Sequence, residues 1–321
     1  MPRRYRNSLI RPPETTNRRE VRHHVGMAFP IPSELAEVAA STLRTGFIRA
    51  LRVDPEVSTF STEGDAGWFG PESVVWRVHS DLSTLVGGLR ALLYQTLHPL
   101  AIAGVAEHSD YRHDPWGRLH RTAEFVAATT YGTSEEAQAA VEVVKRVHQH
   151  VKGVAPDGRP YSANDPDLLA WVHATEVDSF LAAYNRYGPG LSPADADQYV
   201  AEMAVVGRAL DSDPVPETTA ELAEVIARYR IHASPQARET LKFLVFPPLD
   251  WKLRPAYGLV TAAAIELLPV TAQIELRLIS PPFAGPVAVR PALRTLLNTL
   301  RWALGESPSL VAARERTAKD N

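Results

Sequence analysis

The sequence predicts an all-α protein that folds as a single multi-helix domain. From residue 33 onward, apolar residues recur at three- and four-residue spacing, which is the period of a helix face. Helix-start signals precede several of these segments, including Thr133-Ser134-Glu135-Glu136, Asn164-Asp165-Pro166 and Ser192-Pro193. The sequence contains no long alternating run typical of a half-buried strand, and no internal repeat.

Most predicted helices have a recognisable first or last residue. Ser33 can cap the first of them, Gly132 ends the helix that begins at Pro115, and Gly153 ends the next. Gly188-Pro189-Gly190 stops the long apolar helix that begins at Asp165. The predicted helices cover about 33–45, 83–107, 115–131, 134–152, 165–187, 192–210, 219–232, 234–246, 257–278 and 291–304.

Composition divides the chain into three predicted parts. Residues 1–32 are rich in arginine and lack a continuous apolar stretch, so we expect a basic, flexible arm rather than a secretory signal, and hence a cytoplasmic protein. Residues 33–306 form the predicted helical domain. Residues 307–321 are polar and predict a flexible tail.

Charge and residue usage exclude several classes of function. The formal net charge of −3 gives no overall field for nucleic acid or an anionic membrane. Because there is no cysteine, disulfides, thiolate haem ligands, iron–sulfur clusters and cysteine nucleophiles are excluded. The apolar stretches Leu82–Val105 and Tyr257–Ile279 contain charges and proline, so they predict core helices rather than transmembrane segments. Nucleotide-binding and hydrolase motifs are also absent.

His148 lies on the apolar stripe of the predicted helix over 134–152, where a core side chain is expected. A histidine there is either a hydrogen-bonded core residue or a metal ligand. Its Nδ1–H can bond the carbonyl one turn back, which leaves Nε2 free for iron. His150 lies about 200° further around the helix, so both cannot bind one metal. The stripe consists of Ala137, Val141, Val144, His148 and Val151.

A second candidate surface lies on the preceding predicted helix. Arg118, Arg121, Thr122 and Phe125 share one face of it, which favours an anion or oxygen site. Arg118 can pair with a carboxylate such as a propionate, while Arg121 and Thr122 can donate hydrogen bonds to a bound oxygen. An exposed basic helix face is the alternative interpretation.

Other histidines and glycines remain candidates. His98, His108 and His173 could form a non-haem metal site, although His173 is mainly interpreted as a buried, hydrogen-bonded core residue with Glu176 as a candidate partner. Gly88, inside an apolar helix, indicates close approach by another helix or by a flat ligand.

The ordered motifs over residues 68–187 resemble the family of latex-clearing proteins (rubber oxygenases) and MpaB-type oxygenases. The resemblance rests on these segments: Gly87-Gly88-Leu89-Arg90, His98-Pro99, Gly104-Val105, His108-Ser109, Asp114-Pro115, Arg118, Arg121-Thr122, Val147-His148-Gln149-His150-Val151-Lys152-Gly153, Tyr161-Ser162-Ala163-Asn164-Asp165-Pro166 and Trp171-Val172-His173.

The resemblance implies an all-α fold with a globin-like core around haem b. It implies that His148, in its His-x-x-Val-x-Gly setting, is the proximal iron ligand, and that Arg118 and Thr122 form the haem-side Arg-x-x-x-Thr motif. His173 and Gly88 are further candidates for cofactor contact. The resemblance implies two differences from rubber oxygenases, which look like secreted enzymes and have a lysine where this chain has Arg121. An arginine is bulkier than lysine and stays charged, so polyisoprene is not the expected substrate.

The leading hypothesis is therefore a haem b-dependent oxygenase that uses dioxygen or peroxide on an apolar, lipid- or isoprenoid-like small molecule. Arg118, Arg121 and Thr122 are its candidate catalytic residues. One alternative is a non-catalytic haem-binding or gas-sensing protein that shares His148. Another is a non-haem metal oxidoreductase built on His98, His108 and His173. The oligomeric state stays open, a homo-oligomer included.

Overall fold

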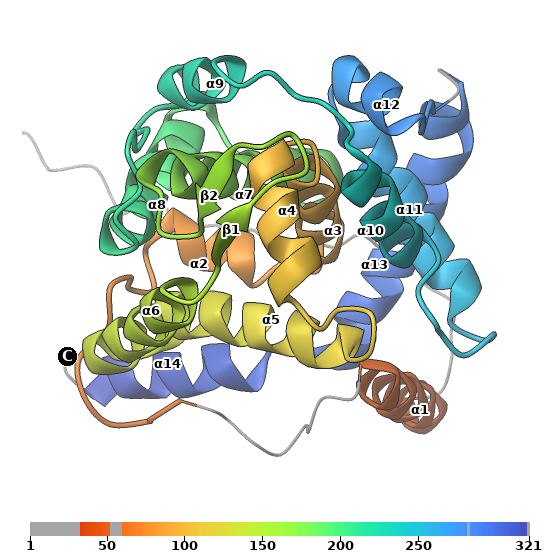
Figure 1. Cartoon of the computed structure of the whole chain (residues 1–321). Coiled ribbons are helices and arrows are strands. Elements are labelled where there is room, and N and C mark those ends of the chain that lie inside the picture. Colours follow the sequence, from red (N-terminus) through yellow and green to blue (C-terminus); the bar gives the residue numbers. More distant parts are fainter. Residues whose placement is uncertain (1–32, 52–59, 281–282, 320–321) are drawn as a thin grey trace, which may run out of the picture.

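The computed structural model describes residues 33–51, 60–280 and 283–319 (Figure 1). The predicted basic arm over 1–32 lies outside these ranges. Within them, an all-α fold is confirmed, with one short hairpin as the β structure. The elements are α1 (Ser33–Leu51), α2 (Val74–His79), α3 (Thr84–Gln95), α4 (Pro99–His108), α5 (Pro115–Tyr131), α6 (Ser134–His148), β1 (Lys152–Val154), β2 (Pro160–Ser162), α7 (Pro166–Tyr187), α8 (Pro193–Ala209), α9 (Thr219–Ala227), α10 (Pro235–Val245), α11 (Arg254–Leu267), α12 (Val270–Leu276), the π-helix η1 (Gly285–Val289), α13 (Arg290–Leu304) and α14 (Pro308–Lys319).

Two helices predicted as continuous are each broken at a proline. Over 83–107 the chain forms α3 and α4, with extended backbone at His98 before Pro99. Proline has no N–H for the helix ladder and disfavours helical backbone at the residue before it. Pro269 divides the predicted helix 257–278 into α11 and α12 for the same reason.

The predicted end of the 134–152 helix and the predicted tail both differ from the structure. Helix α6 ends at His148, and Lys152–Val154 pairs with Pro160–Ser162 as an antiparallel hairpin. The prediction of a loose tail after residue 306 is wrong over 308–319, which form α14. Leu310 and Ala313 of this helix are buried in the core. Arg316 donates hydrogen bonds of 2.6 Å to the carbonyls of Ser61 and Tyr131.

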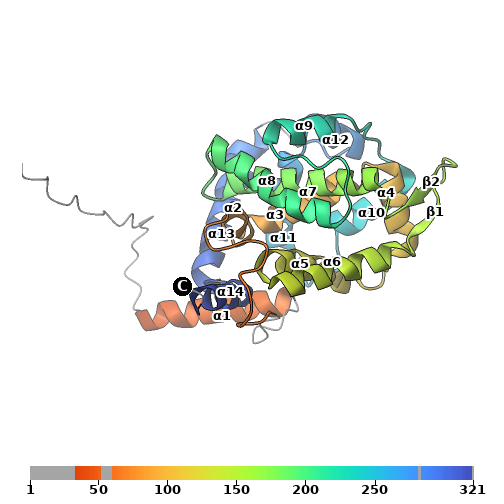
Figure 2. The same ribbon diagram turned by 90° about the vertical axis from the view of Figure 1, so that its left-hand side faces the viewer.

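Helix α7 is the shared wall of two apolar clusters and lies in the middle of the molecule (Figures 1 and 2). Its Val177 and Phe180 pack with residues of α2 and α8, whereas its Trp171 packs with residues of α3, α11 and α13. Gly87 permits α3 to approach α7, because a Cβ atom there would lie 2.7 Å from the Phe180 ring. These two helices form the scaffold on which the rest of the domain is placed.

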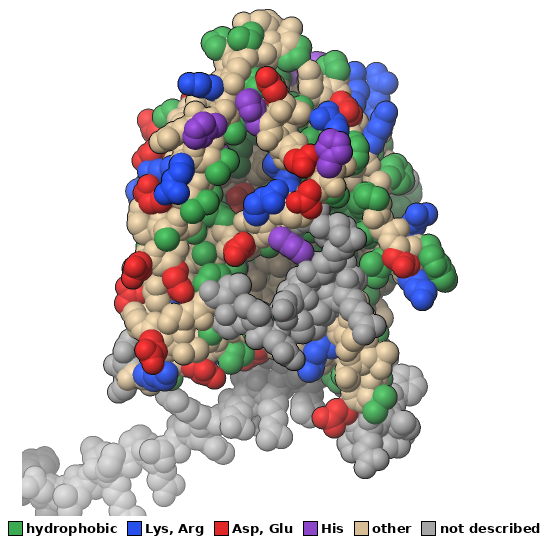
Figure 3. All heavy atoms as spheres, turned by 60° about the horizontal axis from the view of Figure 1, so that its bottom comes forward, with side chains coloured by type: hydrophobic (Ala, Val, Ile, Leu, Met, Phe, Trp, Pro, Cys, Tyr) green, Lys and Arg blue, Asp and Glu red, His purple; other side chains and the backbone are tan. Residues whose placement is uncertain are grey.

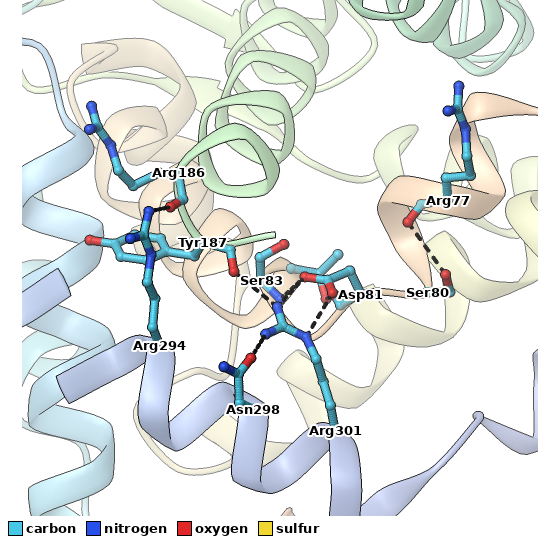
Figure 4. A network of polar contacts seen from close by, with 10 residues as sticks. Arg77, Ser80, Asp81, Ser83, Arg186, Tyr187, Arg294, Asn298 and Arg301 are labelled. Carbon is cyan, nitrogen blue, oxygen red and sulfur yellow. Dashed lines mark hydrogen bonds and ion pairs between the residues drawn. The ribbon is translucent and has the colours of Figure 1, made fainter. Parts of the chain in front are cut away.

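Arg301 of α13 connects three distant parts of the chain (Figure 4). Its guanidinium pairs with both carboxylate oxygens of Asp81, at 2.9 and 2.8 Å. It also donates to the Tyr187 carbonyl at 3.0 Å and to the Asn298 side chain at 2.8 Å. The loop between α2 and α3 is thereby held to the end of α7 and to α13.

Candidate active site

Helices α5 and α6 form an antiparallel hairpin around Gly132. Asp114 caps α5 by accepting a hydrogen bond from the Gly117 N–H at 2.8 Å. Thr133 and Glu136 form a capping box at the start of α6. Because the hairpin folds back on itself, the beginning of α5 lies beside the end of α6. This geometry places Arg118 level with His148.

Arg118 is half-buried at the beginning of α5. Its Nη1 donates to Ser109 Oγ at 2.5 Å. Burial lowers the pKa of the Arg118 guanidinium, and the neighbouring charge of Arg121 lowers it further. A guanidinium nonetheless stays protonated in proteins, so this position holds a fixed, partly desolvated positive charge that is suited to an anionic group.

His148 is the last residue of α6 and is half-buried. Burial lowers the pKa of its imidazole, and the charge of Arg118 acts in the same direction. No hydrogen bond reaches this ring within the described part of the chain. The expected bond from Nδ1 to the carbonyl one turn back is found instead at the exposed His150, whose Nδ1 lies 3.1 Å from the Arg146 carbonyl. His148 is thus a half-buried imidazole whose surroundings favour its neutral form.

Arg121 and Thr122 are exposed on the same helix. The Arg121 guanidinium lies 3.6 Å from the Asp114 carboxylate, and its side chain is 65% exposed. Thr122 Oγ1 donates to the Arg118 carbonyl at 3.1 Å. Arg118 is therefore the more buried of the two arginines, while Arg121 and Thr122 are exposed to solvent.

Gly88 differs from the adjacent Gly87. A Cβ atom on Gly88 would have one neighbour within 4.0 Å, the edge of the Phe180 ring, so this surface of α3 is free of close helix contacts. The absence of a side chain there leaves room for a flat ligand against the helix backbone. The close helix approach on α3 is therefore at Gly87 and not at Gly88.

His173 is buried, and its environment differs from the one predicted. Its Nε2 has no hydrogen-bond partner among the described residues and faces α8, where a Cβ on Gly207 would lie 2.9 Å away. Burial lowers the pKa of His173 to about 4, so the ring is neutral at physiological pH. No hydrogen bond between His173 and Glu176 is found among the described residues.

His98, His108 and His173 are not assembled into a shared site. The His98 ring packs against Trp171 and Tyr229, with centroid distances of 5.9 and 5.7 Å, and its Nδ1 accepts from the Ala101 N–H at 3.4 Å. Within the described residues, no group of three or more His, Asp or Glu side chains is placed to hold a metal ion. The structure therefore gives no support to the proposed histidine cluster.

A polar group deep in the domain has no strong signal in the sequence. His79, on the short helix α2, lies 2.8 Å from Thr130 Oγ1 and 3.0 Å from the Tyr199 hydroxyl. Burial lowers the pKa of His79 to about 4 and raises that of Glu176 to about 7. Both side chains nonetheless keep part of their surface accessible. The two His79 contacts join residues 51 and 120 positions apart in the chain.

The underside of the molecule is hollowed (Figure 3). Basic, acidic and histidine side chains surround the opening, and apolar side chains lie within it. Helices α5 and α6 border this side of the domain in Figure 1. The hollow therefore lies on the side of the domain that α5 and α6 border.

Replacing Glu176 by glutamine tests whether this carboxyl is enclosed. An unfolded glutamate titrates near pH 4.3, whereas Glu176 keeps its proton up to about pH 7. The folded state binds more protons in that window, so stability falls as pH rises through it. We expect the unfolding free energy of Glu176→Gln, relative to wild type, to rise by on the order of 2 kcal/mol between pH 5 and 8. Urea denaturation at both pH values measures this difference, and a constant difference would contradict it.

Comparison with known proteins assigns the chain to a family. Residues 76–302 match the family model described as ER-bound oxygenase mpaB/B'/rubber oxygenase, catalytic domain, which covers more than half of the chain. No curated protein and no solved structure matches significantly. In the described ranges, no helix is both long enough and apolar enough to cross a bilayer. The chain belongs to the family of mpaB and rubber oxygenase catalytic domains.

Proposed function

We propose that this protein is a haem b-dependent oxygenase that uses dioxygen on an apolar, lipid- or isoprenoid-like small molecule. The observation that carries the proposal is the pairing of a neutral, half-buried His148 with the half-buried cation of Arg118 at the open end of the α5–α6 hairpin. Membership of an oxygenase family gives the reaction class.

The residues at this position fit haem b. An imidazole that no described residue hydrogen-bonds is a suitable axial ligand, and the lack of cysteine leaves histidine as the natural choice. Arg118 is placed to pair with a propionate through its charged, partly desolvated guanidinium. Gly88 of α3, whose nearest neighbour is Phe180 of α7, stays a separate candidate for contact with a flat ring. When bound, haem b supplies the redox-active iron for oxygenation.

Arg121 and Thr122 are assigned to the side of the site that meets oxygen and substrate. The Arg121 side chain is exposed and carries several N–H donors, with a loose 3.6 Å contact to Asp114 that it can exchange. Thr122 places its hydroxyl one turn from Arg118. With haem b bound, the N–H groups of Arg121 and the Thr122 hydroxyl would supply hydrogen-bond donors on this side of the site, the Thr122 hydroxyl by leaving the Arg118 carbonyl.

The substrate is assigned as apolar because half-buried apolar side chains lie on the adjacent helices α3 and α7. Leu92 of α3 and Val172 of α7 are half-buried, and the Gln95 amide of α3 donates to the Val172 carbonyl at 3.2 Å, which places these two surfaces side by side. Such a surface binds hydrocarbon by removing it from water. The lipid or isoprenoid class rests on the family resemblance.

Oxygen uptake by the haem-loaded protein tests this function. The protein would be offered a panel of lipids, short isoprenoids and apolar aromatic compounds, with an oxygen electrode and product mass spectrometry as readouts. We expect uptake with at least one apolar compound and incorporation of labelled oxygen into its product. A stable haem complex that consumes no oxygen with any of them would favour a haem carrier or sensor instead.

A further inference from the structure

The end of α4 contacts both sides of the His148 region. Glu107, His108 and Ser109 are consecutive residues there. The Tyr161 hydroxyl, from β2, donates a short hydrogen bond to Glu107 Oε2 and lies 3.1 Å from His108 Nε2. Ser109 Oγ accepts the 2.5 Å hydrogen bond from Arg118. Three adjacent residues thus hold β2 on one side and α5 on the other.

A short segment links Tyr161 to His148. Tyr161 pairs with Gly153 in the β1–β2 hairpin. Gly153 follows His148 by five residues in the chain. The Val151 N–H donates to the His148 carbonyl at 3.1 Å, and the Ala163 N–H donates to the Val151 carbonyl at 2.8 Å. With its backbone bonded at both ends, this segment has little freedom to absorb a shift. Movement of Tyr161 is therefore passed to the end of α6.

Two glycines allow this close arrangement. A Cβ atom on Gly153 would lie 2.7 Å from the Tyr161 hydroxyl oxygen and 3.0 Å from Glu107 Oε2. A Cβ on Gly104 of α4 would lie 3.4 Å from both the Tyr161 ring and the Val151 side chain. Tyr161 itself is 5% exposed, and burial, followed by the Glu107 contact, raises its pKa to about 12. The phenol is thus a fixed, protonated donor.

We propose that Tyr161, held by Glu107 and His108, is a positioning residue for His148. This inference rests on the proposed ligand role of His148. The hydroxyl fixes the hairpin on α4, and Ser109 fixes Arg118 on the same helix end, so the imidazole and the guanidinium share one support. Residues that orient a metal ligand commonly change metal affinity 10–100-fold when they are altered.

Tyr161→Phe removes the hydroxyl and keeps the ring. Tyr257→Phe is the matched control, because its hydroxyl donates to the Leu244 carbonyl at 2.5 Å in the α10–α11 region. We expect Tyr161→Phe to release haem to an excess of an apo-globin acceptor about 10–100-fold faster than wild type, and to shift the reduction potential of the bound iron. The control is expected to leave both unchanged. Equal release rates and potentials in wild type and Tyr161→Phe would overturn the proposal.

A measurement without haem separates this inference from the proposed function. In apo-protein labelled with 13C-histidine, the His148 ring signal is assigned by its absence from His148→Ala. We expect it to move in Tyr161→Phe and in Gly153→Ala, which crowds the hydroxyl, but not in Tyr257→Phe. An unmoved signal in both site variants, with circular dichroism confirming their fold, would reject the positioning role. Failure of the wild type to bind haem would instead reject the ligand role of His148.

Discussion

Replacing Arg90 by methionine is expected to lower the unfolding free energy by about 3 kcal/mol, at the lower end of the range for breaking a buried ion pair. Arg90 is 3% exposed on α3. Its guanidinium contacts Asp178 at 2.7 Å, Ser179 at 2.6 Å and the Leu267 carbonyl at 2.9 Å. Methionine fills the volume and leaves these three acceptors without their donor. The lower end applies because Asp178 keeps 31% of its side-chain surface in solvent.

The matched control for Arg90 is Arg77→Met. Arg77 pairs with Asp195 at 2.9 Å, but both side chains are well exposed, at 45% and 40%. Exposed pairs contribute about 0–1 kcal/mol, so this variant should remain close to wild type. Chemical denaturation followed by circular dichroism measures both. Similar losses in the two variants would show that Arg90 does not join α3 to α7 and α11.

Replacing Arg118 by methionine is expected to have the largest effect on cofactor binding after loss of the ligand itself. A charge-assisted hydrogen bond contributes about 1.5–3 kcal/mol, which corresponds to roughly 10–150-fold weaker haem binding. Arg118 is half-buried beside His148, so solvent cannot replace the lost charge fully. Spectroscopic titration of the apo-protein with haem measures the change.

Arg121→Met separates the two arginines of the α5 face. Its side chain is 65% exposed, so we expect haem affinity to stay within a few-fold of wild type while oxygen uptake falls. Opposite behaviour of the pair, with Arg121 controlling affinity and Arg118 controlling uptake, would reverse their proposed roles. Any compound that supports oxygen uptake by the wild type can be used for this comparison, so the natural substrate need not be known.

Local signals in the sequence were sufficient for most of the helices. The capping box at Thr133 and the Asp165-Pro166 start are found where they were predicted, because caps depend on neighbouring residues alone. The breaks at Pro99 and Pro269 were visible as prolines, yet the apolar period continued across them and favoured one helix. In both places the missing N–H outweighed the apolar pattern.

Features that depend on distant partners could not be predicted in this way. The segment 308–319 is polar by composition and was predicted as a tail, but Leu310 and Arg316 find partners in the core and at Tyr131. The pairings of His79 with Tyr199 and of Tyr161 with Glu107 likewise join residues far apart in the chain. Arg118 and His148 were predicted separately, and the α5–α6 hairpin brings them together.

The most direct test of the account is the ultraviolet–visible spectrum of protein expressed with added haem, recorded beside His148→Ala and His150→Ala. His150 is the matched control, since it is exposed and bonded to the Arg146 carbonyl. We expect a Soret band in wild type and His150→Ala that is lost in His148→Ala. A band that survives in His148→Ala, or a wild type that takes up no haem, would contradict it.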